Sequence, residues 1–451
     1  MTPQTPLPAP IPATAPVTPT PAPIPPIPLP PDPYGPEQVA PAEVFARIKR
    51  HFSPRTSVGL RLVGRSAVES GAGGCRVELS DGRTPLDFGS YAVGLLGHRP
   101  PEVLDAVRRQ LDVMTTSTRV LANPVPARAA DALTGYLAAL PGGAALHRVY
   151  FGLNGCDAVE AAVKLARLVT GRPRVLAVTG AYHGKSLGAL ALTHHPGFRA
   201  GLEDALAPTT HLDPADPGAV ARECARGDVA ALIFEPIQGE NGVRPLPAHV
   251  LAAWCEAAHA YGAMVVVDEI QTGLRRCGEP SLALAQGLEI DALLLGKALG
   301  GGVMPLSAML CTEELYAPLE ENPHIHTATF SGHPLSCATV PPMLALVEQH
   351  AERGRLIAAA MERGLAELAA RHDTLVLEAR GRGLLWALEL RAESLLTPVT
   401  TALARQGLLV SPCVSSPTAL RLLPSIVATD AEIAEALSIL DAVLGATKPA
   451  D

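Results

Sequence analysis

The stretch Asp291-Ala-Leu-Leu-Leu-Gly-Lys297-Ala-Leu-Gly-Gly-Gly302 decides the fold of this 451-residue chain, because it joins a short apolar run to a lysine and a cluster of glycines. An earlier segment, Met264-Val-Val-Val-Asp268-Glu269, is also apolar and ends in two acids. Short, uninterrupted apolar runs of this kind predict strands that are buried on both faces. The polar residues that follow such strands predict a ligand site at their carboxyl ends.

Similar strands alternate with helical patterns between about residues 100 and 300. The predicted strands are Arg174–Val178, Ala230–Phe234, Ala263–Val267 and Ala292–Leu295. Because apolar strands separated by helices form mostly parallel sheets with helices on both faces, we predict an α/β fold. His183, Glu235, Asp268 and Lys297 would then gather beyond the carboxyl ends of the strands.

Lys297 and Asp268 together predict pyridoxal phosphate chemistry. A lysine flanked by glycines can reach the aldehyde of this cofactor and form a Schiff base with it. An aspartate at a neighbouring strand end can keep the pyridine nitrogen protonated, so that the ring withdraws electrons. In this interpretation the lysine supplies the covalent bond and the aspartate maintains the electron sink.

Changes in composition divide the chain into segments. Residues 1–36 contain sixteen prolines and predict a disordered or polyproline II tail, either a solvated extension or a segment that docks to a partner. Residues 37–98 are expected to begin a small domain, with an antiparallel hairpin region over 57–88. Residues 99–345 would form the large cofactor-binding domain. Residues 346–451 would complete the small α/β domain with an amphipathic helix, a strand over Leu384–Leu390 and a final helix near 430–444.

The composition favours an enzyme over a nucleic-acid-binding or membrane protein. The net charge is −8, the basic residues form no long cluster, and no stretch is apolar enough to span a bilayer. The eight cysteines are scattered and form no CxxC pair, so neither a metal site nor a disulfide framework is expected. A reducing cytoplasm is therefore the expected compartment.

A helix is expected to begin close to Asp157 and to continue to Arg167. Glu160 and Lys164 would pair on one of its faces. The N-terminus of this helix suits a phosphate, because the free amides around Gly155 and Cys156 add to the positive end of the helix dipole. An ordinary glycine turn with an aspartate cap explains the same residues.

The run Gly180-Ala-Tyr182-His183-Gly184-Lys185-Ser186 follows a predicted strand. Tyr182 can stack on a planar cofactor ring, and His183 can serve in the same pocket. The run also resembles a P-loop, with the strand that ends at Asp268 as the acidic strand of an ATPase. A P-loop has four residues between its first glycine and its Gly-Lys-Ser, whereas only three residues separate Gly180 from Gly184-Lys-Ser. An ATPase is therefore a remote alternative.

Six motifs, taken together, resemble the class III, fold type I pyridoxal phosphate aminotransferases in order and spacing. They are Asn154-Gly-Cys, Tyr182-His-Gly-Lys-Ser, Glu235-Pro-Ile-Gln-Gly-Glu240, Asp268-Glu-Ile-Gln-Thr-Gly273, Gly296-Lys-Ala-Leu-Gly-Gly-Gly302 and Thr329-Phe-Ser-Gly-His-Pro-Leu335. The resemblance runs from about Val44 to the C-terminus. It is strongest to the putrescine branch, in the group that includes ornithine and acetylornithine aminotransferases.

The resemblance implies a role for each matching residue around the ring. Lys297 would hold the cofactor and then carry a proton between the substrate carbon and the cofactor carbon. Asp268 would pair with the pyridinium nitrogen, and Gln271 would hydrogen-bond the ring oxygen. Tyr182 would stack on the ring, with His183 nearby.

The resemblance also implies that two chains hold the phosphate. Gly155 and Cys156 would donate amides to it, and Thr329 would reach the phosphate of the other subunit. The active sites would then lie at the two-fold interface of a homodimer or a higher homo-oligomer. A monomer is expected to be inactive.

Three further residues are expected to meet substrates. Arg421 matches the family arginine that grips the carboxylate of glutamate or of its oxo acid. Glu240 matches the switch that pairs with this arginine when a substrate without that carboxylate enters. Tyr91 is expected either to face the substrate or to lie in the core. The alternative interpretation of Arg421 is a surface arginine near a domain seam.

The resemblance thus implies a fold type I transferase, with a large domain and a small α/β domain built from both ends of the chain. It would move an amino group from a terminal amine, such as putrescine or ornithine, to 2-oxoglutarate or pyruvate. Departures from the family pattern at Asn154, Cys156, Asn241, Ser331 and His333 leave the identity of the amine open. A racemase or aminomutase on the same fold and a non-catalytic interaction protein are the alternatives.

Overall fold

The computed structural model describes residues 39–449. The proline-rich tail predicted for residues 1–36 lies outside the described residues. Within the described part of the chain, no helix is both long enough and apolar enough to cross a bilayer.

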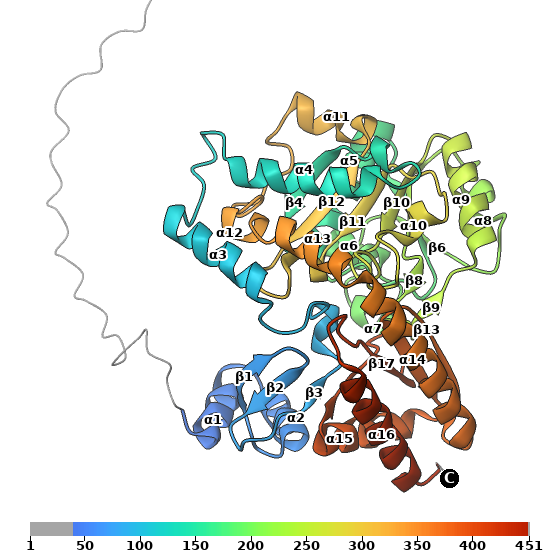
Figure 1. Cartoon of the computed structure of the whole chain (residues 1–451). Helices are drawn as coiled ribbons and strands as arrows, with labels where there is room; N and C mark the ends of the chain where they lie inside the picture. The colour runs from blue at the N-terminus through green and yellow to red at the C-terminus, as the bar shows by residue number, and fades with distance from the viewer. Residues whose placement is uncertain (1–38, 450–451) are drawn as a thin grey trace, which may run out of the picture.

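A seven-stranded sheet forms the centre of the larger part of the molecule (Figure 1). Its strands, in spatial order, are β4 (Arg148–Gly152), β12 (Ser307–Cys311), β11 (Ala292–Leu295), β10 (Met264–Asp268), β7 (Val229–Phe234), β5 (Arg174–Val178) and β6 (Thr209–Leu212). β12 runs antiparallel to both of its neighbours, and the other strand pairs are parallel. The predicted, mostly parallel sheet is therefore confirmed.

Both faces of this sheet are covered. Along β10, Val265 and Val267 belong to one apolar cluster, whereas Met264 and Val266 belong to another on the opposite face. The first cluster includes side chains from α4 (Pro124–Ala138) and α9 (Ala248–Ala260), and the second includes α5 (Gly155–Thr170) and α11 (Glu313–Glu321). Since neither face of the inner strands meets water, β10, β11 and β7 are apolar at successive positions rather than at alternate ones.

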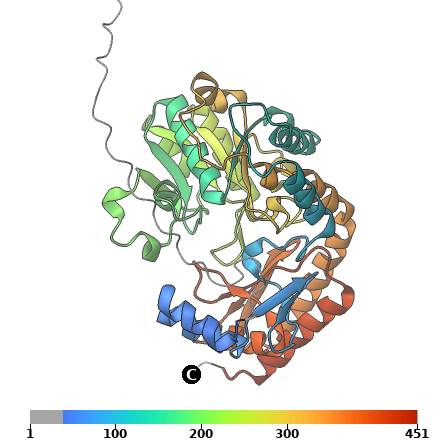
Figure 2. The ribbon, with the colours of Figure 1, turned by 90° about the vertical axis from the view of Figure 1, so that its left-hand side faces the viewer.

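Two smaller sheets combine the N-terminal and C-terminal parts of the chain. One holds β1 (Glu69–Gly73), β2 (Arg76–Leu79), β3 (Leu86–Asp87) and β15 (Leu408–Leu409), and the other holds β13 (Val376–Arg382), β14 (Leu385–Leu390), β17 (Ala419–Leu422) and β16 (Ser411–Pro412). β15 pairs with β3, which joins a C-terminal strand to the N-terminal hairpin. Both ribbon views place these segments side by side below the large sheet (Figures 1 and 2). The N-terminal and C-terminal parts of the chain therefore share one small sheet, and the domain boundaries near residues 98 and 345 stay a prediction.

The remaining elements lie around these sheets. They are the helices α1 (Pro41–His51), α2 (Pro54–Gly64), α3 (Pro101–Val113), α6 (Leu187–Leu192), α7 (Pro196–Arg199), α8 (Ala219–Cys224), α10 (Leu282–Ala285), α12 (Pro334–Cys337), α13 (Val340–Gln349), α14 (Ala351–Arg371), α15 (Leu396–Gln406) and α16 (Asp430–Ala446), and the strands β8 (Ile237–Gln238) and β9 (Arg244–Pro245). The strand predicted over Leu384–Leu390 and the final helix near 430–444 are present as β14 and α16.

The hairpin region predicted over residues 57–88 is wrong in its first part. Residues 57–64 belong to α2, because Ser53 caps that helix by accepting a hydrogen bond of 3.0 Å from the amide of Thr56, and Pro54 occupies its first position. The antiparallel hairpin begins at Glu69.

Candidate active site

Four side chains from the sequence prediction meet at the carboxyl edge of the large sheet. His183 follows β5, Glu235 follows β7, Asp268 ends β10 and Lys297 follows β11. These strands are neighbours in the order β11, β10, β7, β5, so the segments after them lie together. The charges of Asp268 and Glu235 both act on Lys297.

His183 and Asp268 form the base of this cluster. The Nδ1 atom of His183 lies 2.8 Å from Oδ2 of Asp268, and both side chains are buried. The other carboxylate oxygen accepts a hydrogen bond of 3.1 Å from the amide of Ile270. Burial disfavours the charged imidazole, but the hydrogen bond and charge of Asp268 outweigh it and raise the pKa of His183. The pair therefore fixes the orientation of the aspartate.

Glu235 is a buried acid to which the sequence assigned a position but no role. Its carboxylate accepts hydrogen bonds from the amides of Tyr182 at 2.9 Å and Gly239 at 3.4 Å. Burial is the main reason that the pKa of Glu235 rises to about 7, and the charge of Asp268 adds to the effect. The sequence contained a signal for a role in the site, because Glu235 follows a buried strand and residues after neighbouring parallel strands lie together.

Glu235→Gln is expected to change how stability depends on pH. In the wild-type chain the folded carboxyl keeps its proton up to about pH 7, whereas the unfolded one releases it near 4.5, so stability falls as pH rises between these values. The full loss is on the order of 3 kcal/mol, from a shift of 4.5 to about 7 at about 1.4 kcal/mol per unit. Urea unfolding of the cofactor-free protein from pH 4.5 to 8, at one protein concentration, measures it.

The Gln variant should lack this part of the pH dependence. Glu362→Gln, on the exposed side of α14, is the matched control and should follow the wild-type curve. Parallel curves for wild type and Glu235→Gln would show that Glu235 does not hold a proton in the folded state.

Lys297 occupies a strained turn. Its φ of 44° lies in the left-handed region, at the start of the short helical turn η4 (Lys297–Gly300). Residues other than glycine are uncommon there, and such strain concentrates at functional sites. Burial, with a smaller effect from Arg421, lowers the pKa of Lys297, although Glu240 opposes the shift. A lysine with a lowered pKa more readily supplies the neutral amine needed as nucleophile and base.

Arg421 and Glu240 form a buried ion pair. Nη1 of Arg421 contacts Oε1 of Glu240, and the side chains are only 2% and 9% exposed. Glu240 also accepts the amide of Val414 at 3.1 Å and Nε2 of Gln271 at 3.3 Å. Burial raises the pKa of Glu240, but Arg421 and Lys297 outweigh it and lower the value. The alternative of a surface arginine is therefore wrong, since Arg421 lies inside the molecule.

Gln271 depends on a glycine for its position. A Cβ on Gly239 would lie 1.4 Å from Oε1 of Gln271, so the amide can occupy this space only because residue 239 has no side chain. That amide oxygen is buried and has no hydrogen-bond partner among residues 39–449. A buried polar atom without a partner indicates a missing ligand or water.

Ile270 brings two glycine turns together. A Cβ on Gly155 would lie 3.0 Å from this side chain, and one on Gly296 would lie 3.1 Å from it. Ile270 therefore fits between the turn before α5 and the turn that precedes Lys297. The loop after Asp268 is in this way packed against both turns.

The turn before α5 is capped by Asn154 rather than by Asp157. The Asn154 side chain accepts the amide of Asp157, and the Asp157 carboxylate accepts the amide of Asn154, which is a capping box. The helix begins at Gly155. The amides of Gly155 and Cys156 have no acceptor within residues 39–449 and stay available to an anion.

The predicted pair between Glu160 and Lys164 is wrong. Lys164 instead donates to the carbonyl oxygen of Ile325 at 2.8 Å. Glu160 accepts hydrogen bonds from Ser186 Oγ at 2.6 Å and from the amide of Gly188 at 2.9 Å. Tertiary acceptors and donors thus replace the local helix pair, and Glu160 ties α5 to the segment after His183.

Tyr182 is half-buried beside this segment. Its ring meets Phe198 edge to face at 6.3 Å, and Nζ of Lys185 lies 4.0 Å from the centre of the Phe198 ring. A Cβ on Gly184 would lie 2.3 Å from Sγ of Cys156, so this loop packs directly on the turn before α5. The structure therefore brings Tyr182 and Cys156 to neighbouring turns.

Thr329 and Tyr91 lie outside the buried cluster of one chain. Thr329 is exposed, its hydroxyl makes no hydrogen bond within residues 39–449, and Arg119 donates to the preceding carbonyl, that of Ala328, at 2.5 Å. Tyr91 is 79% exposed, so the alternative that it belongs to the core is wrong. Its turn η1 (Ser90–Ala92) nevertheless packs against η4, the turn of Lys297.

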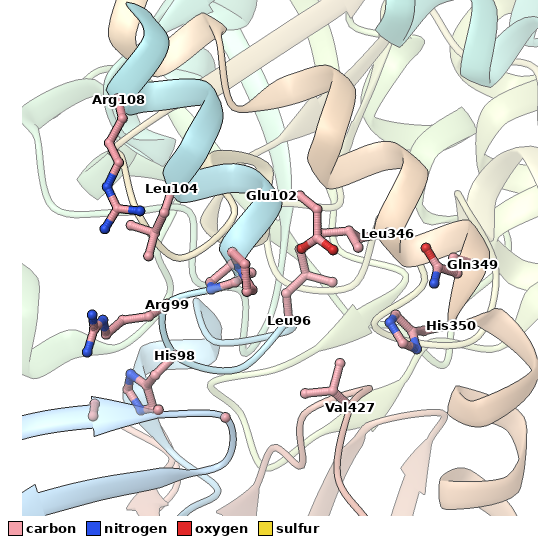
Figure 3. A pocket seen from close by; sticks show the side chains of 15 residues that line it. Leu96, His98, Arg99, Glu102, Leu104, Arg108, Leu346, Gln349, His350 and Val427 are labelled. Atoms are coloured by element: carbon pink, nitrogen blue, oxygen red, sulfur yellow. The ribbon is translucent and has the colours of Figure 1, made fainter. Parts of the chain in front are cut away.

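A separate pocket of about 600 Å³ lies between the N-terminal hairpin and α3. Figure 3 shows Arg108, Arg99 and His98 along one side and Gln349 and His350 on the other. None of the predicted site residues lines it. The candidate active site is therefore the polar cluster at the strand ends and not this pocket.

The described residues contain no group of three or more histidine, cysteine or acidic side chains that could hold a metal ion. All eight cysteines are free, and seven of them are buried.

A family model for class III aminotransferases matches residues 65–444, which include the whole strand-end cluster. The chain belongs to the class III aminotransferases. Members of this family are pyridoxal phosphate-dependent transaminases, so the fold type I assignment, the cofactor and the reaction class predicted from the sequence are confirmed.

Individual relatives agree with this family assignment. The putrescine aminotransferase of Pectobacterium atrosepticum is 37% identical over 79% of this chain and 78% of its own length. The crystal structure of the ornithine aminotransferase from Toxoplasma gondii has a TM-score of 0.81 at 27% identity and covers 90% of this chain and 96% of its own. An amine transaminase from an uncultivated Pseudomonas species, solved with pyridoxal phosphate bound, has a TM-score of 0.74 at 28% identity, over 84% of this chain and 94% of its own.

Proposed function

We propose that this aminotransferase takes the amino group from a terminal amine, either a diamine such as putrescine or an ω-amino acid such as ornithine, and gives it to 2-oxoglutarate or pyruvate. The observation that carries the proposal is the buried ion pair of Arg421 and Glu240 within electrostatic reach of Lys297. The pair offers a site for the carboxylate of a substrate on Arg421, and Glu240 is the counter-ion of this arginine when no such carboxylate is bound. The similarity to a putrescine aminotransferase and an ornithine aminotransferase supports the amine class.

The residues around Lys297 fit pyridoxal phosphate. When bound, the cofactor supplies an electron-withdrawing ring and a carbon that accepts the amino group. Asp268, oriented by His183, would hold the ring nitrogen in its protonated form. Nε2 of Gln271 donates one hydrogen to Glu240, so its second hydrogen would be the donor to the ring oxygen. The amides of Gly155 and Cys156 would hold the phosphate.

Lys297 would bind the cofactor and move the proton. Its lowered pKa favours the neutral form of Nζ, which would take a proton from the substrate carbon and return it at a second position. The buried carboxylates around Lys297 would stabilise the ammonium that forms when Nζ takes up the proton. This arrangement lets one residue serve as base and acid within a single reaction.

Glu240 and Arg421 would let one pocket accept two substrates. An oxo acid brings a carboxylate that can replace Glu240 on the planar guanidinium of Arg421. A diamine brings no such group, so Glu240 would stay in place and neutralise the arginine. Glu240 accepts hydrogen bonds from Val414 and Gln271, so the proposed exchange would occur between the C-terminal strands and the loop after β10.

A second copy of the chain would complete each site. Thr329 would reach the phosphate of the partner subunit, which explains why it is exposed in one chain. Leu121 and Phe330 line one surface cavity together with Thr329, and both of these apolar side chains are exposed. Exposed large apolar side chains beside Thr329 support burial of this surface in a homodimer or higher homo-oligomer.

Thr329→Ala is expected to weaken cofactor binding across this interface. The loss would be about 1 to 3 kcal/mol, because a charge-assisted hydrogen bond to the phosphate would go unreplaced. Hybrids of Thr329→Ala and Lys297→Ala chains provide the measurement. If Thr329 acts across the dimer, one site of each hybrid carries both changes and the other carries neither, so hybrids keep one intact site. Hybrids without an intact site would contradict the cross-subunit placement.

We also place the enzyme in the cytoplasm. Eight unpaired thiols suit a reducing compartment and support this part of the proposal.

An amine panel tests the proposed function. Putrescine, ornithine and other terminal amines should each be tried with 2-oxoglutarate and with pyruvate, and formation of glutamate or alanine measured. Transfer from terminal amines that needs an oxo acid is the expected result, with Lys297→Ala as the inactive control. Exchange of an α-hydrogen in an amino acid without any oxo acid would instead indicate a racemase or aminomutase.

A further inference from the structure

The turn that carries Tyr91 has an unfavourable backbone. Ser90, Tyr91 and Ala92 have φ values of 37°, 51° and 64°, and none of them is glycine. Three consecutive residues in the left-handed region persist only where the surrounding structure holds them. The contacts that hold this turn therefore matter for where Tyr91 stands.

Asp87 holds the start of the turn. Its side chain is 6% exposed and accepts hydrogen bonds from the amide of Gly89 at 2.9 Å and from the hydroxyl of Ser90. His98, on the wall of the pocket in Figure 3, lies 2.8 Å from the same carboxylate. These contacts fix one end of the turn and leave its other end to a different residue.

Arg276 reaches the other end from the loop after Asp268. It is 1% exposed, and its guanidinium donates to the carbonyl oxygens of Pro424 at 2.9 Å, Leu384 at 3.3 Å and Ala92 at 3.4 Å. Its Nε has no partner, and no carboxylate pairs with it among residues 39–449. Burial lowers the pKa of Arg276 to about 10, so the group is still a cation at neutral pH.

A buried cation without a carboxylate is unfavourable, so its position needs a reason. The three carbonyls belong to three separate segments: the Tyr91 turn, the start of β14 and the chain after β17. Arg276 itself lies five residues after Gln271 in the loop that starts at Asp268. One guanidinium thus joins the cofactor loop to the Tyr91 turn and to the strand of Arg421.

We infer that Arg276 is a positioning residue that holds the Ser90–Ala92 turn against the Lys297 turn, so that Tyr91 is fixed where the amine donor enters. The packing of η1 on η4 places the two turns in contact. The exposure of Tyr91 leaves its ring free for the donor. The part of this inference that concerns the amine donor rests on the proposed function, whereas the part that concerns the position of the turn does not.

Amide hydrogen exchange in the cofactor-free protein tests the clamp. Arg276→Met removes the donors but keeps an apolar stem, and it should speed exchange of the amides of residues 89–95 by about tenfold or more, because the turn opens locally. Arg275→Met is the matched control, since this neighbouring arginine pairs with Glu348 and makes no contact with the turn. Its exchange over residues 89–95 should match the wild type.

Kinetics of the loaded enzyme tests the role of the clamp. Arg276→Met should raise KM for the amine donor by about tenfold and change kcat by less than about threefold, because only the donor's contact with Tyr91 is loosened. If Arg276→Met does not fold, Arg276→Lys replaces it, since lysine keeps the charge but lacks the fork that reaches three carbonyls. Adding Ala92→Gly removes the cost of a left-handed backbone at residue 92 and should therefore reverse part of the rise in KM for the amine donor.

Two results would overturn the inference. Exchange over residues 89–95 that is unchanged in both Arg276 variants would show that the turn does not depend on this residue. An equal fall in kcat and cofactor retention with an unchanged donor KM would show a purely structural role. Failure of every terminal amine as a substrate would count against the proposed function alone, because the exchange measurement needs no substrate.

Discussion

Lys297→Ala is expected to abolish transamination and the covalent attachment of pyridoxal phosphate. The turnover rate should fall by about a thousandfold or more, since the variant loses both the nucleophile that holds the cofactor and the base that moves the proton. The alanine also removes a buried amine from among Glu240, Asp268 and Glu235, whose charges all act on it. Borohydride reduction of the loaded wild-type enzyme, followed by peptide mapping, should tag Lys297.

Lys164→Ala serves as the control for this experiment. Lys164 donates to the carbonyl oxygen of Ile325 on the surface of the large domain, away from the strand ends. Its variant should keep the yellow colour and the activity of the wild type. A tag on Lys164 or Lys185 in the mapped peptides would mean that the cofactor lysine has been assigned to the wrong residue.

Arg421→Ala and Glu240→Ala are expected to damage different halves of the reaction. Arg421→Ala should weaken use of 2-oxoglutarate by about 30-fold or more, because truncating one member of a buried ion pair costs about 2 to 5 kcal/mol. It should largely spare the half-reaction of the amine donor. Glu240→Ala should harm the donor half more, since the unpaired cation of Arg421 would then repel a cationic diamine.

Single-turnover spectra of each half-reaction separate these effects. The donor half is followed with amine alone, and the acceptor half with oxo acid added to the enzyme that already carries the amino group. Glu240→Gln is the matched variant, because it keeps the shape of the side chain and its contact to the amide of Val414 while removing the charge. Equal damage to both halves in all three variants would mean that the pair is structural and that the oxo acid's carboxylate is held elsewhere.

The large domain was predictable because its signals are local. The five inner strands of the large sheet are buried on both faces, so the chain there is apolar at consecutive positions, and this can be read without knowing the neighbours. β11 over Ala292–Leu295 and β10 over Met264–Asp268 lie within one residue of their predicted positions. The chemistry of Lys297 and Asp268 followed from the same rule, since residues after parallel strands meet at one edge.

The predictions that were wrong concern segments in which tertiary contacts or a helix cap outweigh the local sequence pattern. Glu160 and Lys164 have the spacing of a helix pair, yet each finds a stronger partner from another segment. Residues 57–64 contain glycines and short apolar runs, but a serine cap and a proline at the first position start a helix there. Exposed helix pairs contribute little free energy, so a buried or better-placed partner displaces them.

The sequence by itself determined the α/β class, the strand-end cluster and the aminotransferase family, because burial pattern and motif spacing are written along the chain. The family resemblance implied that Glu240 pairs with Arg421, but only the tertiary structure decided that this pair is buried, that burial raises the pKa of Glu235, and that Arg276 clamps the Tyr91 turn. The contacts of Arg421 and Arg276 join residues more than a hundred positions apart, and the raised pKa of Glu235 depends mainly on desolvation. Such contacts exist only after the chain has packed, so no local pattern can specify them.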